Sequence, residues 1–198
     1  MLIGDSRAGL VERQMRRDRY NVAAHISIPG ATTGSFKYQS FEQLPEDTEL
    51  ILIFLYQCDF TKKEGQLIKP NPDVNIYQLV EDSEFITAKL KARCPNAAVF
   101  WTIPVVRKFT SQEIRCRQET YDMCASIRRL IPMLKDRKIP FLDLAVPFKT
   151  GEFREPHDKK YLVDGVHPTI AGTLVLFSHF KIVMMKSGVA KKVISRNT

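Results

Sequence analysis

The sequence predicts an α/β fold in which helices cover both faces of a parallel sheet. Segments typical of strands alternate with segments of helical periodicity along all 198 residues. One segment, residues 50–56, is apolar without alternation, as expected of a strand buried on both faces of a parallel sheet. No repeat, linker or change in composition divides the chain, so we expect one domain over residues 1–185 and a basic tail over residues 186–198.

The first half of the chain predicts three strands and two helices. The strand segments are apolar or β-branched and end at glycine or proline, and the helical segments carry apolar residues three and four positions apart. In chain order we expect a strand over 1–4, a helix over 7–19, a strand over 20–28, the strand over 50–56 and a helix over 76–93. Residues 29–34 contain two glycines, and residues 57–75 are rich in Lys, Pro and Asn, so both are expected to be loops.

The second half continues the alternation. We expect a strand over 97–103, a long helix over 111–138 that Pro132 kinks or divides, a strand over 139–144, a loop over 145–163 and a helix over 169–185. The sheet would then have five parallel strands. In such sheets ligands bind outside the carboxyl ends of the strands, so the residues directly after each strand are the informative ones.

Composition argues against several protein classes. The chain is 44% hydrophobic and 26% charged, and no apolar run reaches the ~18 residues that span a bilayer. The N-terminus carries no signal-peptide pattern, so we expect a cytoplasmic protein without a membrane partner, with the nucleus left open. Four cysteines without a C-x-x-C pair predict reduced thiols, and the four histidines lack metal-ligand spacing, so we expect no metal and no cofactor.

Two short motifs lie where the fold places ligand sites. Ser6 follows the first strand at a sharp turn into a helix, where a serine can act as a nucleophile or simply cap the helix. Asp164 precedes His167 by three residues on a loop that enters the last helix. A carboxylate there can hold the Nδ1 proton of the imidazole and leave Nε2 facing a nucleophile, although both residues could equally serve the turn.

Together these motifs resemble the SGNH or GDSL hydrolase family. Gly4-Asp5-Ser6 matches the family's first block, Gly30 its second and Asp164-Gly165-Val166-His167 its last. The resemblance implies a flavodoxin-like, three-layer α/β/α sandwich and a catalytic set of Ser6, Asp164 and His167. It further implies that the backbone amides of Ser6 and Gly30 bind the oxyanion.

The third block departs from the family pattern Gly-x-Asn-Asp. Here it is Tyr56-Gln57-Cys58-Asp59, which keeps the aspartate but has Tyr at the glycine and Cys at the asparagine. The asparagine supplies a third oxyanion donor, and losing one such donor costs about 10²–10³ in rate. We expect Tyr56 to take up substrate space. We expect Cys58 to fill space as a half-buried thiol rather than to act as a nucleophile, and we do not expect Gln57 to replace the asparagine as a donor.

Basic residues are in excess, with a formal net charge of +8 that favours an anionic partner. Those on predicted helices and loops are candidate RNA contacts. They are Arg16, Arg17, Arg115, Arg128, Arg129, Arg154, Lys159 and Lys160. In fold, charge and the altered third block the chain resembles the RNA-binding C-terminal domain of the germ-plasm organiser Oskar, which lacks a working hydrolase site.

Two functions therefore follow from the sequence. The first is a hydrolase-like domain with an impaired oxyanion site that serves as a basic RNA-binding module, with further protein partners left open. The alternative is an active serine esterase that uses Ser6, His167 and Asp164 on a small acyl ester. The intact Ser6, Gly30, Asp164 and His167 favour the enzyme, whereas the altered third block and the charge favour the binding module.

Overall fold

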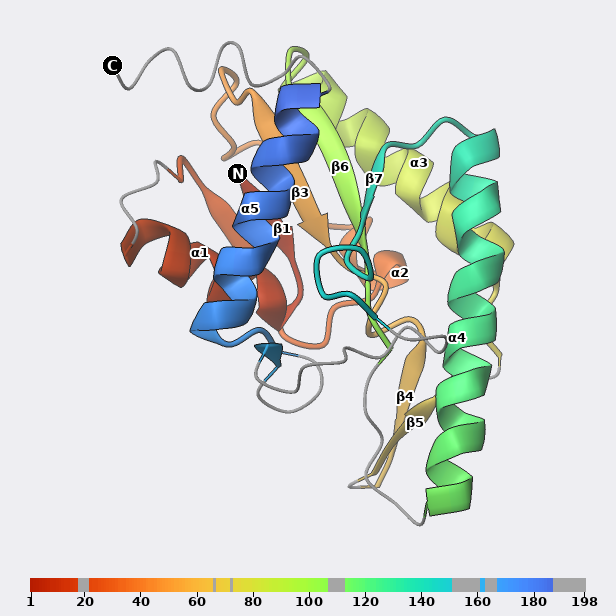
Figure 1. The fold of residues 1–198 in the computed structure, drawn as a ribbon. Coiled ribbons are helices and arrows are strands. Elements are labelled where there is room, and N and C mark those ends of the chain that lie inside the picture. Colours follow the sequence, from red (N-terminus) through yellow and green to blue (C-terminus); the bar gives the residue numbers. More distant parts are fainter. Residues whose placement is uncertain are drawn as a thin grey trace.

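A computed structural model of the chain describes residues 1–17, 22–65, 67–71, 73–106, 113–150, 161–162 and 167–186. At its centre lies a five-stranded sheet in the order β2-β1-β3-β6-β7, and every neighbouring pair is parallel. The strands are β1 (Leu2–Gly4), β2 (His25–Ser27), β3 (Leu50–Phe54), β6 (Ala98–Ile103) and β7 (Phe141–Asp143). Helices cover both faces of this sheet (Figure 1), so the predicted three-layer α/β/α fold is confirmed.

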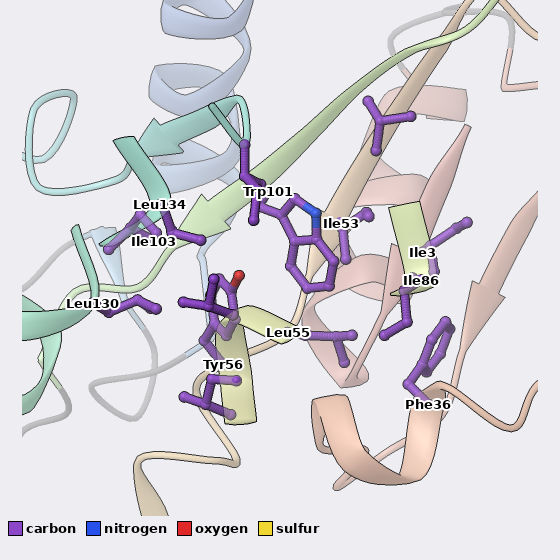
Figure 2. Close-up of a cluster of buried hydrophobic side chains, with 14 of the residues drawn as sticks. Ile3, Phe36, Ile53, Leu55, Tyr56, Ile86, Trp101, Ile103, Leu130 and Leu134 are labelled. Atoms are coloured by element: carbon purple, nitrogen blue, oxygen red, sulfur yellow. The ribbon is translucent and has the colours of Figure 1, made fainter. Parts of the chain in front are cut away.

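Two helices pack on each face of the sheet. On one face lie α1 (Ser6–Arg17) and α5 (Ile170–Lys186), and on the other lie α3 (Ile76–Arg93) and α4 (Glu113–Asp136) (Figure 1). Neighbouring residues of β3 belong to different cores, since Ile53 packs with residues of α3 and α4 (Figure 2) and Phe54 packs with residues of α1 and α5. Burial on both faces explains why β3 is apolar without alternation.

Two elements fall in segments that were expected to be loops. A hairpin of β4 (Thr61–Glu64) and β5 (Leu67–Pro70) pairs antiparallel outside the main sheet, within the expected loop over 57–75. Its first strand, Thr-Lys-Lys-Glu, buries no apolar face, so its sequence lacks the alternation of apolar and polar residues that identifies a strand. The four-residue helix α2 (Thr33–Phe36) is too short to show periodicity, and its Thr32 and Ser35 form a capping box.

The other differences concern element ends. The strand expected over 20–28 is only three residues long, because β2 is an edge strand that pairs with β1 alone. Helix α4 runs through Pro132 as one continuous helix, so the proline does not divide it. The helix expected over 169–185 matches α5 to within one residue at each end.

Gly4 brings β1 unusually close to β3. A Cβ on this residue would lie 2.0 Å from the carbonyl oxygen of Phe54, and the φ of Gly4 is +145°. The backbone amide of Asp5 donates to that same oxygen at 2.8 Å, and the amide of Ile28 donates to the oxygen of Gly4 at 2.9 Å. Only glycine allows the two backbones to come this close, and the close approach fixes the residues after β1 against the end of β3.

Tyr56 adopts a left-handed backbone conformation just beyond β3. Its φ of +69° is uncommon for a bulky residue and costs about 1–3 kcal/mol. The side chain is fully buried, its ring stacks on Trp101 at 5.0 Å between centroids, and its hydroxyl lies 2.6 Å from that of Ser83 (Figure 2). The Ser83 hydroxyl donates to the carbonyl of Leu79, so Tyr56 is the donor to Ser83.

Replacing Tyr56 by phenylalanine tests this anchor. The Tyr56→Phe variant keeps the ring stack and the strained backbone but removes the hydroxyl that donates to Ser83. We expect a loss of about 1 kcal/mol in the free energy of unfolding, measured by urea denaturation with an unchanged slope. Tyr38→Phe, at an exposed tyrosine, is the matched control and should change nothing measurable. An equal effect of both substitutions would show that the buried hydroxyl does not stabilise the turn.

Candidate active site

The structure brings together two residues that lie 161 positions apart. Ser6 begins α1 directly after β1, and His167 lies just before α5. The Oγ of Ser6 and the Nε2 of His167 are 2.8 Å apart, within hydrogen-bonding distance, and both side chains are half-buried. Because the hydroxyl can donate to an unprotonated Nε2, this is the contact that a serine nucleophile and its general base require.

The segment around His167 is held by backbone contacts. Pro168 forms an antiparallel bridge with Leu162, and the amide of Thr169 donates to the carbonyl of Tyr161 at 3.0 Å. A Cβ at Gly172 would lie 2.1 Å from that carbonyl oxygen, so α5 approaches the Tyr161 backbone as only glycine allows. These contacts set the position of the imidazole relative to the sheet.

A buried ion pair supports the turn that carries Ser6. The carboxylate of Asp5 accepts from the backbone amide of Arg7 at 2.9 Å, from its Nε at 3.0 Å and from its Nη2 at 2.7 Å. The Nη2 also donates to the carbonyl of Leu55 at 2.8 Å, just past the end of β3. Both charged side chains are almost completely buried, so their hydrogen bonds replace the lost solvent.

Arg7 is the site residue that the sequence analysis missed. The signal that could have found it is its place beside Ser6 with an aspartate two positions earlier, because a guanidinium can pair in bidentate fashion with such a carboxylate.

Gly30 lies in the loop after β2, at the same edge of the sheet. Its φ of +77° calls for glycine even though a Cβ there would meet no atom within 4 Å. Among the described residues, none accepts a hydrogen bond from the backbone amide of Gly30. The first amides of a helix have no acceptor within the helix, so the amide of Ser6 at the start of α1 is likewise available for an anion.

Asp59 ties the Gly30 loop to the turn after β3. Its carboxylate accepts from the backbone amide of Thr33 at 3.1 Å and from the Thr33 hydroxyl at 3.0 Å. Burial raises the pKa of Asp59 to about 6, although the hydrogen bonds from Thr33 act in the opposite direction. The aspartate of the third block therefore holds two loops of the site together.

Cys58 lies beside the serine turn with a neutral thiol. Its Sγ is half-buried, 3.9 Å from the Oδ2 of Asp5, and burial together with that carboxylate raises the pKa of the thiol to about 11. A thiol that stays protonated is a poor nucleophile, and His167 contacts Ser6 instead. Gln57 is buried with its amide 4.0 Å from the Sδ of Met123, so it does not replace the missing asparagine.

The expectation that Tyr56 takes up substrate space is wrong. The ring lies in the core between the sheet and the α3 and α4 layer, where it stacks on Trp101 (Figure 2). That stack and the contact of its hydroxyl with Ser83 hold the side chain in the core.

The remaining predicted site residues either lie on elements apart from one another or fall outside the described residues. Asp164, Arg154, Lys159 and Lys160 fall outside the described residues. Arg16 and Arg17 end α1, whereas Arg128 and Arg129 lie on α4 across the sheet, and Arg115 is in the first turns of α4. Arg16 bonds Glu12 and donates to the carbonyl of Val22. The arginines of α1 and α4 therefore do not form one surface, and RNA binding stays a prediction.

The described part of the chain contains neither a cluster of metal ligands nor a membrane-spanning helix. There, no three His, Cys, Asp or Glu side chains come together as a metal site needs. No helix in the described ranges is long and apolar enough to cross a bilayer. In the same part of the chain, free thiols are carried by Cys58, Cys94 and Cys124.

The pKa of Asp59 predicts how stability depends on pH. Between an ordinary value of 3.8 and about 6, the folded chain holds a proton on Asp59 that the unfolded chain has lost. The free energy of unfolding should therefore fall as pH rises through this window, by about 3 kcal/mol at most for this group, and level off above it. Urea denaturation from pH 4 to pH 7 measures the effect.

The Asp59→Asn variant should remove that part of the pH dependence and keep an acceptor for Thr33. Asp73→Asn, at an exposed carboxylate, is the control and should leave the profile unchanged. Parallel profiles for wild type and Asp59→Asn would contradict the raised pKa.

Comparisons with known proteins agree with this geometry. A family model described as GDSL-like lipase/acylhydrolase matches residues 3–180. No curated protein sequence matches the chain. Among solved structures, a GDSL-like lipase from Bacteroides thetaiotaomicron VPI-5482 has 20% sequence identity and a TM-score of 0.63, with 94% of this chain and 87% of that chain covered.

Two further structures share the fold. A candidate acylhydrolase from Bacteroides fragilis NCTC 9343 has 18% identity and a TM-score of 0.64, covering 97% of this chain and 86% of that one. An acetyl xylan esterase has 14% identity and a TM-score of 0.57, covering 90% and 96%. These structures show the fold, and the family-model match over residues 3–180 shows that the chain belongs to the GDSL-like lipase/acylhydrolase family.

Proposed function

We propose that the chain is a serine hydrolase of small acyl esters. The observation that carries this proposal is the 2.8 Å contact between the Oγ of Ser6 and the Nε2 of His167 at the carboxyl edge of the sheet. Family membership supports the same reaction class. A hydroxyl paired with an imidazole is the minimal arrangement for nucleophilic attack on a carbonyl.

In the proposed reaction Ser6 attacks the acyl carbonyl while His167 takes the hydroxyl proton on Nε2. The tetrahedral intermediate collapses when His167 returns that proton to the leaving alcohol, which leaves an acyl group on Ser6. Water, deprotonated by the same imidazole, then attacks the acyl group. The bond between the acyl carbon and the Ser6 oxygen breaks as His167 returns the proton to that oxygen, which releases the acid and restores the serine. Asp164, three residues before His167, is the proposed acceptor for the Nδ1 proton.

The proposed oxyanion site has two strong donors rather than three. The amides of Ser6 and Gly30 supply them, while the Cys58 thiol beside Asp5 is a weak third donor. A missing donor costs about 10²–10³ in rate, so we expect slow turnover that is most visible with activated esters.

A fluorophosphonate probe tests the nucleophile directly. The Ser6 oxygen should displace fluoride from phosphorus and gain the phosphonyl group, which peptide mass spectrometry locates. Ser6→Ala should abolish the labelling, and His167→Gln should slow it by about 10²–10⁴-fold because the general base is lost.

The control is Ser126→Ala, at a serine of α4 that bonds only within its own helix in the described contacts. It should label like the wild type. A folded wild-type chain that neither labels nor hydrolyses esters would contradict the esterase proposal and favour the non-catalytic alternative, for which RNA crosslinking is the assay.

Restoring the family's asparagine tests the third donor. Cys58→Asn places an amide donor beside the serine turn and should raise kcat for a short acyl ester by up to about 10²–10³, with little change in KM. Cys58→Ala removes the thiol without adding a donor, so it should give no increase. Equal rates for the Asn and Ala variants would mean that residue 58 does not face the developing oxyanion.

A further inference from the structure

The outward face of α5 is apolar where a surface helix is normally polar. Side chains on this face recur three and four positions apart, and four large apolar ones are exposed to solvent. Their exposed fractions are 58% for Ile170, 46% for Leu174, 49% for Ile182 and 61% for Met185. Ser178 and Lys181 are the polar residues of the same face, and we call the six residues together the α5 stripe.

The α5 stripe is not part of the core. The opposite side of the helix already packs on the sheet through Leu176, Phe177 and Phe180, which are almost fully buried. Figure 1 shows α5 lying across β1 and β3 with its other side turned outward. An amphipathic helix has one buried face, so a helix that is apolar on both faces calls for something outside the described chain to cover the second.

The sequence segment that contains the α5 stripe carries basic residues and no acidic ones. Residues 165–198 contain five basic residues and no Asp or Glu, so this segment supplies +5 of the chain's net charge of +8. The five are Lys181, Lys186, Lys191, Lys192 and Arg196. One of them lies within the α5 stripe itself, and the others follow it in sequence.

This combination favours one kind of partner. A second copy of the chain would bring two basic segments of the same sign together, which opposes association. Apolar aliphatic side chains with neighbouring cations are instead the pattern of a helix lying in the interface of a membrane that contains anionic lipid. We infer that the α5 stripe docks the protein on an anionic phospholipid surface, with the aliphatic side chains at the headgroup boundary and Lys181 facing lipid phosphates.

The stripe is next to the candidate active site. Ile170, its first residue, lies three positions after His167 on the same continuous segment. Docking would therefore hold the edge of the sheet that carries Ser6 close to the lipid surface. This inference replaces the expectation of no membrane partner, which rested on the lack of a spanning segment.

Co-sedimentation of the full chain with vesicles tests the inference. Vesicles of phosphatidylcholine and phosphatidylserine should bind the wild type, and vesicles of phosphatidylcholine alone should bind it far less. Replacing Leu174 and Ile182 by serine should reduce the partition coefficient at least about tenfold, because apolar area at the interface is lost. Lys181→Glu should reduce it at least about fivefold and weaken its dependence on salt.

The matched control carries Tyr77→Ser and Phe85→Ser, at exposed apolar residues of α3 on the other face of the sheet. It should bind like the wild type, and thermal melting should show that every variant is folded. Ser6→Ala should also bind like the wild type, so docking and ester hydrolysis are tested separately.

Three results would overturn the inference. They are a wild type that does not sediment with anionic vesicles, a Leu174 and Ile182 variant that binds as well as the wild type, and a wild-type dimer in light scattering that this variant converts to monomer. The last result would mean that a second copy covers the α5 stripe.

Discussion

The close approach of β1 to β3 at Gly4 is the constraint on which the site depends. Because no side chain separates the two backbones there, the amide of Asp5 bonds the end of β3 and the chain turns at once into α1. The Asp5–Arg7 pair then fastens the turn to the carbonyl of Leu55. The position of the serine after this turn is therefore fixed, and its hydroxyl lies at the edge of the sheet within hydrogen-bonding distance of His167. Rigid support of this kind is what a nucleophile needs, since small displacements cost much of the rate.

The turn after β3 is held by a bulky residue in a conformation that glycine adopts without strain. Tyr56 has a positive φ, and its cost is offset by the stack on Trp101 and the bond to Ser83. The same turn still delivers Asp59 to Thr33. Backbone and side-chain chemistry are set separately at this block. The backbone of the turn depends on the packing of Tyr56 in the core, whereas the thiol of Cys58 is half-buried beside Asp5.

Much of this could be predicted from the sequence, and the reasons for the failures are physical. The run over residues 50–56 identified β3 because both faces of a central strand are buried, and turn residues after the strands pointed to Ser6 and His167. The β4–β5 hairpin could not be predicted, since the residues of β4 are polar and show no alternation of apolar and polar side chains. Arg7 was missed because its role is to bond a neighbour and a distant carbonyl, which only the folded chain brings within reach. The prediction that Tyr56 takes up substrate space was wrong, because the stack on Trp101 and the contact with Ser83 that hold the ring in the core exist only in the folded chain.

The distance in sequence between Ser6 and His167 has a consequence for when the protein can work. The two residues come from opposite ends of the described chain and meet only after the sheet has formed and α5 has packed on it. Closing so long a loop is among the slowest events in folding. During synthesis Ser6 is made 161 residues before His167 and has no imidazole partner until that later segment has been translated and folded. A chain interrupted before His167 would carry the serine alone, so the proposed reaction needs a chain that extends through His167.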